Sequence, residues 1–229
     1  LLKFVGDKLM EEQVEYGYPF TLGFPNKLAH RFENVVLKYN DLLSFDMWKM
    51  VKTDIKAVEA HSGIRKIETF GEDFDGLWET CSPGYEICVE RRAVFLNWRY
   101  LERPDWEYFP FAFYQGEELK GYIVYKLYRE ADVLRGHIID IFGRRDDENV
   151  FSHLIDHAVG FFKEKAVDEI TVLHWGNALI EKLFTEKGFK QEKTEIPLII
   201  RNNMEHRYGE KIRDKAHWYF NMGDSTEIF

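Results

Sequence analysis

The chain contains 229 residues, of which 45% are hydrophobic and 31% are charged. This mixture is too apolar for an intrinsically disordered protein and too polar for a membrane-embedded one. The formal net charge is −9 and no basic run is interleaved with aromatic residues, so we expect no binding to nucleic acid phosphates. At about 150 residues per domain, the length corresponds to about one and a half domains.

The sequence contains two cysteines, Cys81 and Cys88, which are too few for a disulfide framework and lack the paired spacing of a zinc site. We therefore expect free thiols in a cytoplasmic protein. No long apolar run and no cationic leader before an apolar stretch is present, so we expect no segment to enter a membrane. The opening residues, Leu1 to Val5, are typical of a helix interior, which favours a fragment of a longer chain.

The first part of the chain predicts a helix, a strand and a second helix. Apolar residues recur at helical spacing from Leu1 to Tyr16, and a Gly and a Pro then end the pattern. The run from Phe20 to Phe24 is β-prone, and Asn26 is placed to cap a helix that extends to Lys38.

The same order returns near the other end of the chain. A helical face that begins at Val150 precedes a strand over 170–175 and a helix that starts after Asn177 and ends at Gly188. At an offset of 151 residues, YPFTLGFPNKLAHRF lies over EITVLHWGNALIEKL and Asn26 lies over Asn177. Self-similarity at a domain-sized period indicates a duplicated unit.

We therefore predict three regions in the chain. Residues 1–53 form the C-terminal part of a first unit, residues 54–201 form a complete second unit, and residues 202–229 form a tail that adds a closing strand.

The complete unit has the strand, turn and helix signals of a mixed sheet. A polar hairpin turn is expected at 115–118 and a helix at 95–102. Strands are expected at 64–70, 108–114, 119–128, 136–142, 194–200 and 217–222. The predicted fold class is α+β, with a mixed, mostly antiparallel sheet and helices on both faces.

This order of elements, with Asn177 before a helix that ends in LFTEKGF, resembles the GCN5-related N-acetyltransferase (GNAT) superfamily. GFPNKLAHRF looks like the same element in the first unit, and FLNWRYLERPDWEY and YFNMGDSTEIF look like segments of bacterial tandem GNAT proteins. The resemblance implies transfer of an acyl group from acyl-coenzyme A to an amine. It also implies a Gly-rich loop before a helix, whose backbone N–H groups hold the cofactor pyrophosphate.

In this sequence the corresponding loop reads FGRRDDENVF and keeps a single glycine, Gly143. Three acids, Asp146, Asp147 and Glu148, fill the first helical turn, where they complement the helix dipole, cap its N–H groups and repel a pyrophosphate. The candidate cofactor contacts are Arg144, Arg145 and Asn177. We expect acetyl-coenzyme A to serve the intact protein but to bind this chain weakly or not at all.

The catalytic residues are not identified by the sequence. The resemblance implies a tyrosine as the acid that protonates the leaving thiolate, but the helix after Asn177 has Phe184 in that place. The matching helix after Asn26 offers His30 and Phe32. The first unit is therefore the expected host of catalysis, with a cofactor loop before Leu1.

His153 and His157 are one helical turn apart, a spacing that can place two imidazoles on one metal ion. However, the chain has no HExxH pattern there, and both residues share the polar stripe opposite Leu154. We predict a solvated helix face and no metal.

Two further groups of residues are candidates for ligand contacts. Trp98 and Tyr100 lie in an aromatic-rich segment and are the candidate substrate-binding residues. Glu72, Asp73 and Asp75 could bind an amine or act as a base, although an acidic helix start with Asp73 as N-cap explains them equally.

We predict an N-acyltransferase of the GNAT type that acts on a small-molecule amine. One alternative is a non-catalytic module that binds a small molecule or a partner on a degenerate GNAT fold. A second alternative is a tandem aminoacyl transferase that uses aminoacyl-tRNA, against which the net charge of −9 argues.

Overall fold

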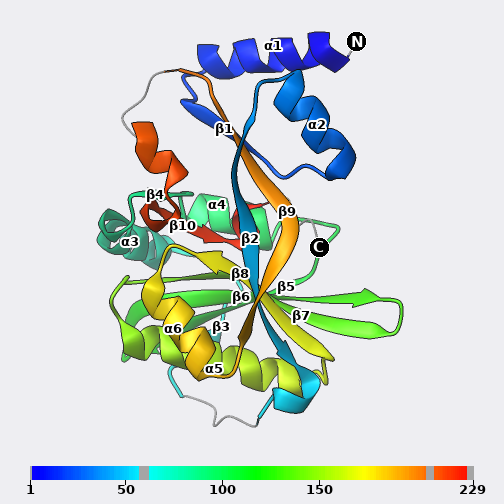
Figure 1. The fold of residues 1–229 in the computed structure, drawn as a ribbon. Coiled ribbons are helices and arrows are strands. Elements are labelled where there is room, and N and C mark those ends of the chain that lie inside the picture. Colours follow the sequence, from blue (N-terminus) through cyan, green and yellow to red (C-terminus); the bar gives the residue numbers. More distant parts are fainter. Residues whose placement is uncertain (1, 57–61, 205–208, 226–229) are drawn as a thin grey trace. The chain divides into compact units, whose positions relative to one another are not determined.

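A computed structural model describes residues 2–56, 62–204 and 209–225 (Figure 1). The chain divides into two compact units. Unit 1 consists of Leu1–Asp46, Lys193–Asp214 and Ser225–Phe229, and unit 2 consists of Met47–Glu192 and Lys215–Asp224.

Unit 1 begins with a helix, a strand and a helix. Its elements are α1 (Leu2–Glu15), β1 (Phe20–Gly23), α2 (Lys27–Val35), the first part of β2 (Asn40–Val51), most of β9 (Lys190–Asn202) and the short helix η3 (Gly209–Arg213). β1 pairs antiparallel with β9, with Gly23 opposite Ile199. Met10, Tyr39 and Ile199 form a small apolar cluster, against which Leu37 packs.

Unit 2 contains most of the sheet and four longer helices. Its helices are η1 (Lys52–Asp54), α3 (Glu72–Cys81), η2 (Ser82–Gly84), α4 (Ala93–Tyr100), α5 (Glu148–Glu164), α6 (Ala178–Glu186), η4 (Lys215–His217) and η5 (Met222–Asp224). Its strands, besides the end of β2, are β3 (Ile64–Lys66), β4 (Ile87–Cys88), β5 (Tyr108–Gln115), β6 (Glu118–Glu130), β7 (Val133–Gly143), β8 (Glu169–Trp175) and β10 (Trp218–Asn221).

The sheet of unit 2 has the strand order β2–β8–β7–β6–β5–β3. All of these neighbours are antiparallel except β7 and β8, which pair in parallel. The parallel pairing covers Arg135 to Ile138 on β7 and Glu169 to Val172 on β8. The carboxyl ends of β7 and β8 therefore point the same way beyond the paired part.

Helices cover both faces of this sheet (Figure 1). Successive residues of a strand point to opposite faces. On β6, Gly121 lies against Val150 and Leu154 of α5, whereas the ring of the next residue, Tyr122, packs near Phe74 of α3. Thus α5 and α3 lie on opposite faces, and the predicted α+β class with a mixed, mostly antiparallel sheet is confirmed.

Most predicted elements are confirmed, and the main differences lie in α2, β3 and β2. The helix after Asn26 ends at Val35, before Lys38, whose φ of 63° is left-handed. β3 has only three residues. β2 is missed by the sequence analysis because its apolar residues are interrupted by Asp41, Asp46 and Lys49 and do not alternate cleanly.

The predicted boundaries also differ from the two units. Residues 193–201 belong to unit 1 and not to the complete unit, and the tail is shared, because Lys215–Asp224 belongs to unit 2. The boundary after Thr53 lies seven residues beyond the observed division at Asp46.

Candidate functional site

The loop FGRRDDENVF, which the resemblance matches to the pyrophosphate-binding loop, lies between the end of β7 and the start of α5. The Asp147 carboxylate caps α5, accepting from the Val150 N–H at 3.1 Å. Asp146 does not cap the helix but accepts from Arg144 Nε at 2.8 Å, which lowers the pKa of the Asp146 carboxyl. The predicted cap is therefore confirmed for Asp147 and wrong for Asp146, and both acids directly precede the first residue of α5.

Arg145 and Asn177 hold this loop to its neighbours. The Arg145 guanidinium donates to the carbonyls of Gly84 at 2.9 Å and Gly176 at 3.1 Å. Asn177 caps α6, accepting from the Leu179 N–H at 3.1 Å, and its amide donates to the Arg145 carbonyl at 3.1 Å. Two of the three candidate cofactor contacts, Arg145 and Asn177, are therefore engaged in bonds within unit 2, and the third, Arg144, pairs with Asp146.

The carboxyl ends of the two parallel strands separate beyond Ile138 and Val172. In open sheets, a crevice outside the carboxyl ends of diverging parallel strands is the usual place for a ligand. Here β10 occupies it, pairing antiparallel with the end of β8, with Phe220 opposite Trp175. On its other edge, β10 pairs in parallel with β4.

Side chains of the same chain also take the backbone acceptors along the end of β7. The carbonyl of Ile141 accepts from the Tyr219 hydroxyl and, at 3.3 Å, from the Asn221 amide. The carbonyl of Gly143 accepts from the Tyr85 hydroxyl at 2.9 Å. An extended ligand that bonded to these carbonyls would compete with those side chains.

The backbone of β10 approaches β8 closely at Gly176. A Cβ atom on Gly176 would lie 1.6 Å from the Trp218 carbonyl oxygen, and the φ of Gly176 is 91°. Only glycine fits this position without moving the strand. Glycine at position 176 therefore allows β10 to pair with the end of β8.

A buried charged cluster, formed by Arg91, Asp140 and Asp224, anchors β10 and η5. The Arg91 guanidinium lies 3.2 Å from Asp140 Oδ1 and 2.7 Å from Asp224 Oδ2, and Arg91 is 1% exposed. Burial raises the pKa of Asp224 to about 6, against the opposing effect of Arg91.

Neutral donors complete the coordination of Asp140. Its Oδ2 accepts from the hydroxyls of Tyr122 at 2.8 Å and Tyr100 at 3.1 Å, and its Oδ1 accepts from the Asn221 amide at 2.8 Å. This cluster is missed by the sequence analysis, in which only Tyr100 appears. The sequence feature that could have indicated the cluster is Asp140, an acid within the otherwise apolar run HIIDIF.

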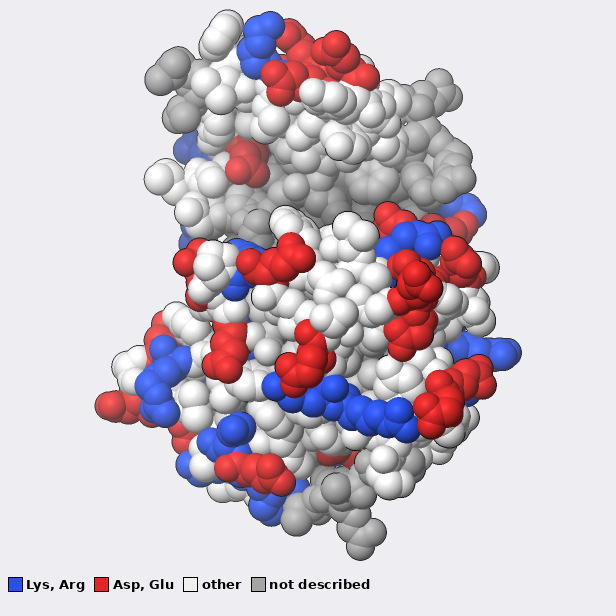
Figure 2. Space-filling model, turned by 180° about the vertical axis from the view of Figure 1, so that it is seen from behind, with Lys and Arg blue, Asp and Glu red and all other residues white. Residues whose placement is uncertain are grey.

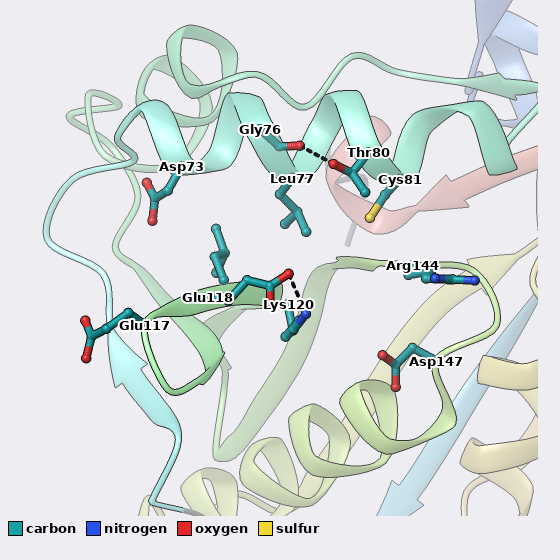
Figure 3. A pocket seen from close by; sticks show the side chains of 11 residues that line it. Asp73, Gly76, Leu77, Thr80, Cys81, Glu117, Glu118, Lys120, Arg144 and Asp147 are labelled. Carbon is teal, nitrogen blue, oxygen red and sulfur yellow. Dashed lines mark hydrogen bonds and ion pairs between the residues drawn. The ribbon is translucent and has the colours of Figure 1, made fainter.

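A cavity of about 490 Å³ lies beside the loop between β7 and α5 (Figure 3). It is lined by α3, by the start of β6 with the preceding turn, and by two loop residues. The lining side chains are Asp73, Leu77, Thr80, Cys81, Glu117, Glu118, Leu119, Lys120, Arg144 and Asp147, together with Gly76. Four carboxylates against two cations favour a positively charged ligand over a phosphate.

The polar groups of this cavity are already partnered. Asp73 accepts from the Tyr114 hydroxyl at 3.0 Å, and Lys120 pairs with Glu118 at 2.5 Å. Asp73 lies within α3, and Gly71 holds the N-cap position, so the predicted Asp73 cap is wrong. Burial raises the pKa of the Cys81 thiol to about 11, which keeps it protonated and poorly nucleophilic at neutral pH.

The two candidate substrate-binding aromatics have different environments. Trp98 is 57% exposed and packs on Phe95, so its contact with a substrate stays a prediction. Tyr100 is 3% exposed and donates to Asp140, so a ligand cannot reach its ring from solvent.

His153 and His157 are only partly exposed. The His153 ring stacks on Phe113 at 5.3 Å between centroids. His157 lies 2.9 Å from the Tyr125 hydroxyl, and burial lowers its pKa. The predicted solvated face is therefore wrong for His157, and it holds in part for His153, whose ring packs on Phe113 but whose Nδ1 bonds the Asn149 carbonyl at an exposed position. In the described ranges, no group of three or more His, Cys, Asp or Glu residues is arranged to hold a metal ion.

Unit 1 contains a histidine paired with a carboxylate. His30 Nε2 lies 2.6 Å from Asp41 Oδ1, and the Asn34 amide donates to the same oxygen at 2.8 Å. These bonds lower the pKa of Asp41. The arrangement fixes Nε2 as the protonated nitrogen of neutral His30 and leaves Nδ1 to accept a proton.

Charges of both signs cover the face shown in Figure 2, where Lys and Arg side chains lie among Asp and Glu side chains. Within the described part of the chain, no helix has both the length and the apolar character needed to cross a membrane.

The fold is that of GCN5-related N-acetyltransferases. The structure is similar to a GCN5-related N-acetyltransferase from Anabaena variabilis, with a TM-score of 0.57, 14% identity and coverage of 86% of this chain and 49% of that one. It is also similar to a probable N-acyltransferase from Enterococcus faecalis, with a TM-score of 0.57, 12% identity and coverage of 86% and 48%.

This chain therefore spans about half the length of those two proteins. No protein-family model matches the sequence, and no curated protein is significantly similar to it.

Proposed function

We propose that this protein is an N-acyltransferase of the GNAT type in which unit 2 does not bind acyl-coenzyme A. In this reaction the amine nitrogen attacks the thioester carbonyl, the carbon–sulfur bond breaks, coenzyme A leaves as its thiolate, and a base takes the amine proton. The fold supports this class of reaction. The occupied crevice between β7 and β8 is the observation that carries the assignment for unit 2.

Acyl-coenzyme A would have to displace part of unit 2 in order to bind there. With its pyrophosphate at the N-terminus of α5, the rest of the molecule would extend along the end of β7. There the side chains of Tyr219 and Asn221 of β10 already bond the carbonyl of Ile141, and Tyr85 bonds that of Gly143. The Asp147 carboxylate occupies the helix N-terminus and would repel the pyrophosphate.

In this proposal, unit 1 supplies the base. His30 is oriented by Asp41 through Nε2, as a general base is oriented by a carboxylate in other enzymes. Its Nδ1 is then the atom that accepts the amine proton. Unit 2 would serve as a non-catalytic part of the same protein.

Calorimetric titration with acetyl-coenzyme A tests the role of unit 2. We expect no saturable binding to residues 1–229. The variant Asp147→Ser keeps a helix cap but removes the charge, and it should not restore binding while β10 remains in place. A micromolar dissociation constant for the unmodified chain, about −8 kcal/mol, would contradict the proposal.

Release of the coenzyme A thiol in the presence of amine acceptors tests the activity, with the protein in its full length. His30→Gln should lower the rate by about 10²-fold or more, whereas His153→Gln, on α5, should leave it unchanged. Unchanged activity in His30→Gln would remove His30 as the base. Absence of thiol release with every amine would contradict acyl transfer itself.

A further inference from the structure

The cavity between α3 and the start of β6 is long enough for an extended small molecule. Its volume of about 490 Å³ lies within the range of ligand pockets. Its α3 wall runs from Asp73 to Cys81, which corresponds to about 12 Å along the helix. Asp73 lies at one end of the cavity, and Arg144 and Asp147 lie at the other end with Cys81 (Figure 3).

The middle of the cavity is apolar. Leu77 of α3 lies between the two ends (Figure 3), and Leu119 of β6 also lines the cavity. Their side chains belong to the core, with 7% and 9% of each residue exposed. Gly76 lines the cavity without a side chain. The middle therefore offers an apolar surface on which a hydrocarbon chain can pack.

Neutral donors hold the carboxylates at the two ends. Asp73 accepts from the Tyr114 hydroxyl at 3.0 Å, and Asp147 accepts from the Val150 N–H at 3.1 Å. Burial raises the pKa of Tyr114 to about 12, so its hydroxyl remains a donor at neutral pH. These bonds orient one oxygen of each carboxylate without cancelling its charge, and the other oxygen can accept from a ligand.

The other charged side chains of the cavity lie in ion pairs. These pairs are Arg144 with Asp146, Lys120 with Glu118, and Glu117 with Arg65. The negative charge of the cavity therefore resides mainly on Asp73 and Asp147, one at each end. A ligand anion would be repelled at both ends, whereas an ammonium group at each end would make a charge-assisted hydrogen bond.

We propose that this cavity binds an aliphatic diamine. One ammonium group donates to Asp73, the other donates to Asp147, and the hydrocarbon chain between them packs on Leu77 and Leu119. The size of the cavity, its apolar middle and its two oriented carboxylates together define this class of ligand. The site does not depend on acyl transfer and remains if the proposed function fails.

Calorimetric titration of the 229-residue chain at physiological ionic strength tests the site. The probes are 1,4-diaminobutane, 1,5-diaminopentane and 1,6-diaminohexane, and n-pentylamine is the control with a single ammonium group. We expect saturable binding of at least one diamine, tighter than that of n-pentylamine by about tenfold or more. Absence of saturable binding for all three diamines, or equal binding of n-pentylamine, overturns the proposal.

Three variants separate this site from general attraction by an acidic protein. Asp73→Asn keeps an acceptor for Tyr114, and Asp147→Asn keeps a helix cap, while each removes one charge. In either variant the diamine should bind no more tightly than n-pentylamine binds the wild type. Glu79→Gln removes a charge of α3 that pairs with Arg92 outside the cavity, and it should leave diamine binding unchanged. Equal losses in all three variants, or unchanged binding in Asp73→Asn or Asp147→Asn, would overturn the assignment.

Discussion

In unit 2, further strands of the chain pair with β8 and cover α5, whereas among the described residues of unit 1 the corresponding strand, β1, pairs with β9 and apolar side chains of α1 such as Val5 and Leu9 are exposed. β8 is paired with β7, β2 and β10, whereas β1 is paired with β9 alone in the described chain. The same helix–strand–helix can therefore be closed or open, depending on which further strands reach it.

The closed copy also shows how a ligand crevice can be lost. The acids of the loop before α5 disfavour a phosphate, but their effect is local and screened by solvent. β10 fills the crevice, and its Tyr219 and Asn221 side chains bond the Ile141 carbonyl of β7. Of the two changes, occupation by β10 is the larger barrier to binding.

The largest expected effect is on the cluster that anchors β10. Arg91→Met leaves the carboxylates of Asp140 and Asp224 buried without their cation, which should destabilise the chain by about 3–5 kcal/mol. Denaturant unfolding measures the loss. Arg92→Met is the control, because Arg92 pairs with Glu79 and Glu90 at the surface, and its melting curve should match that of the wild type. An Arg91→Met variant of wild-type stability would show that β10 does not depend on this cluster.

A matched pair of helix substitutions compares the closed and open copies directly. Leu154→Ala removes a fully buried side chain and should cost about 2–5 kcal/mol. Val5→Ala, on α1, should change stability by less than about 0.5 kcal/mol because Val5 is exposed. Thermal unfolding of both variants checks the prediction, and equal losses would mean that α1 is as well covered as α5.

The buried His174 of β8 should make unit 2 sensitive to acid. Its Nδ1 donates to the Asn221 Oδ1 at 2.7 Å, and its Nε2 is buried without a hydrogen-bond partner in the described residues. Burial lowers its pKa from 6.5 to about 4. The unfolded chain therefore takes up a proton below pH 6.5 that the folded chain refuses until about pH 4.

The stability due to neutral His174 is thus complete above pH 6.5 and falls as the pH drops to about 4, by up to about 3 kcal/mol. Asp224 acts in the opposite direction, since its raised pKa lets the folded chain bind a proton below about pH 6. The variant His174→Gln removes the contribution of the histidine to the pH dependence of the unfolding free energy. The difference in unfolding free energy between wild type and variant should change across this window, and a constant difference would exclude the effect.

Local signals account for what the sequence predicts correctly. The hairpin turn at Gly116, with φ of 63°, and the caps at Asn26, Asn177 and Asp147 depend on residues within a few positions. The turn and the caps can therefore be predicted without knowledge of the fold. The conclusion that the loop before α5 is poorly suited to a phosphate rests on the same kind of local signal.

Contacts between distant segments account for what the sequence misses. Asp224 bonds Arg91, 133 positions away in the sequence, and Asn221 bonds His174, 47 positions away. No local sequence signal therefore predicts that β10 enters the crevice. Asp73 looks like an N-cap, but its carboxylate accepts from Tyr114, 41 residues away. Tyr100 looks like a ligand residue because its partner, Asp140, lies on another strand.

The smallest expected effect concerns the two capping asparagines. Asn26→Ala removes the acceptor for two backbone N–H groups at an exposed helix start and should cost about 0.5–1 kcal/mol. Asn177→Ala removes one such acceptor and also the donor to the Arg145 carbonyl, at a residue that is 2% exposed. Because an unsatisfied buried group adds to the lost cap, the cost should approach about 2 kcal/mol.

Asn177→Asp is the control that separates these two contributions. It keeps an acceptor for the Leu179 N–H but cannot donate to the Arg145 carbonyl, so it should recover only the capping part of the loss. The comparison is made by urea unfolding of the three variants. Equal losses for Asn26→Ala and Asn177→Ala would mean that the Arg145 bond adds nothing, and that the loop before α5 is held by Asp147 and the Arg145 guanidinium alone.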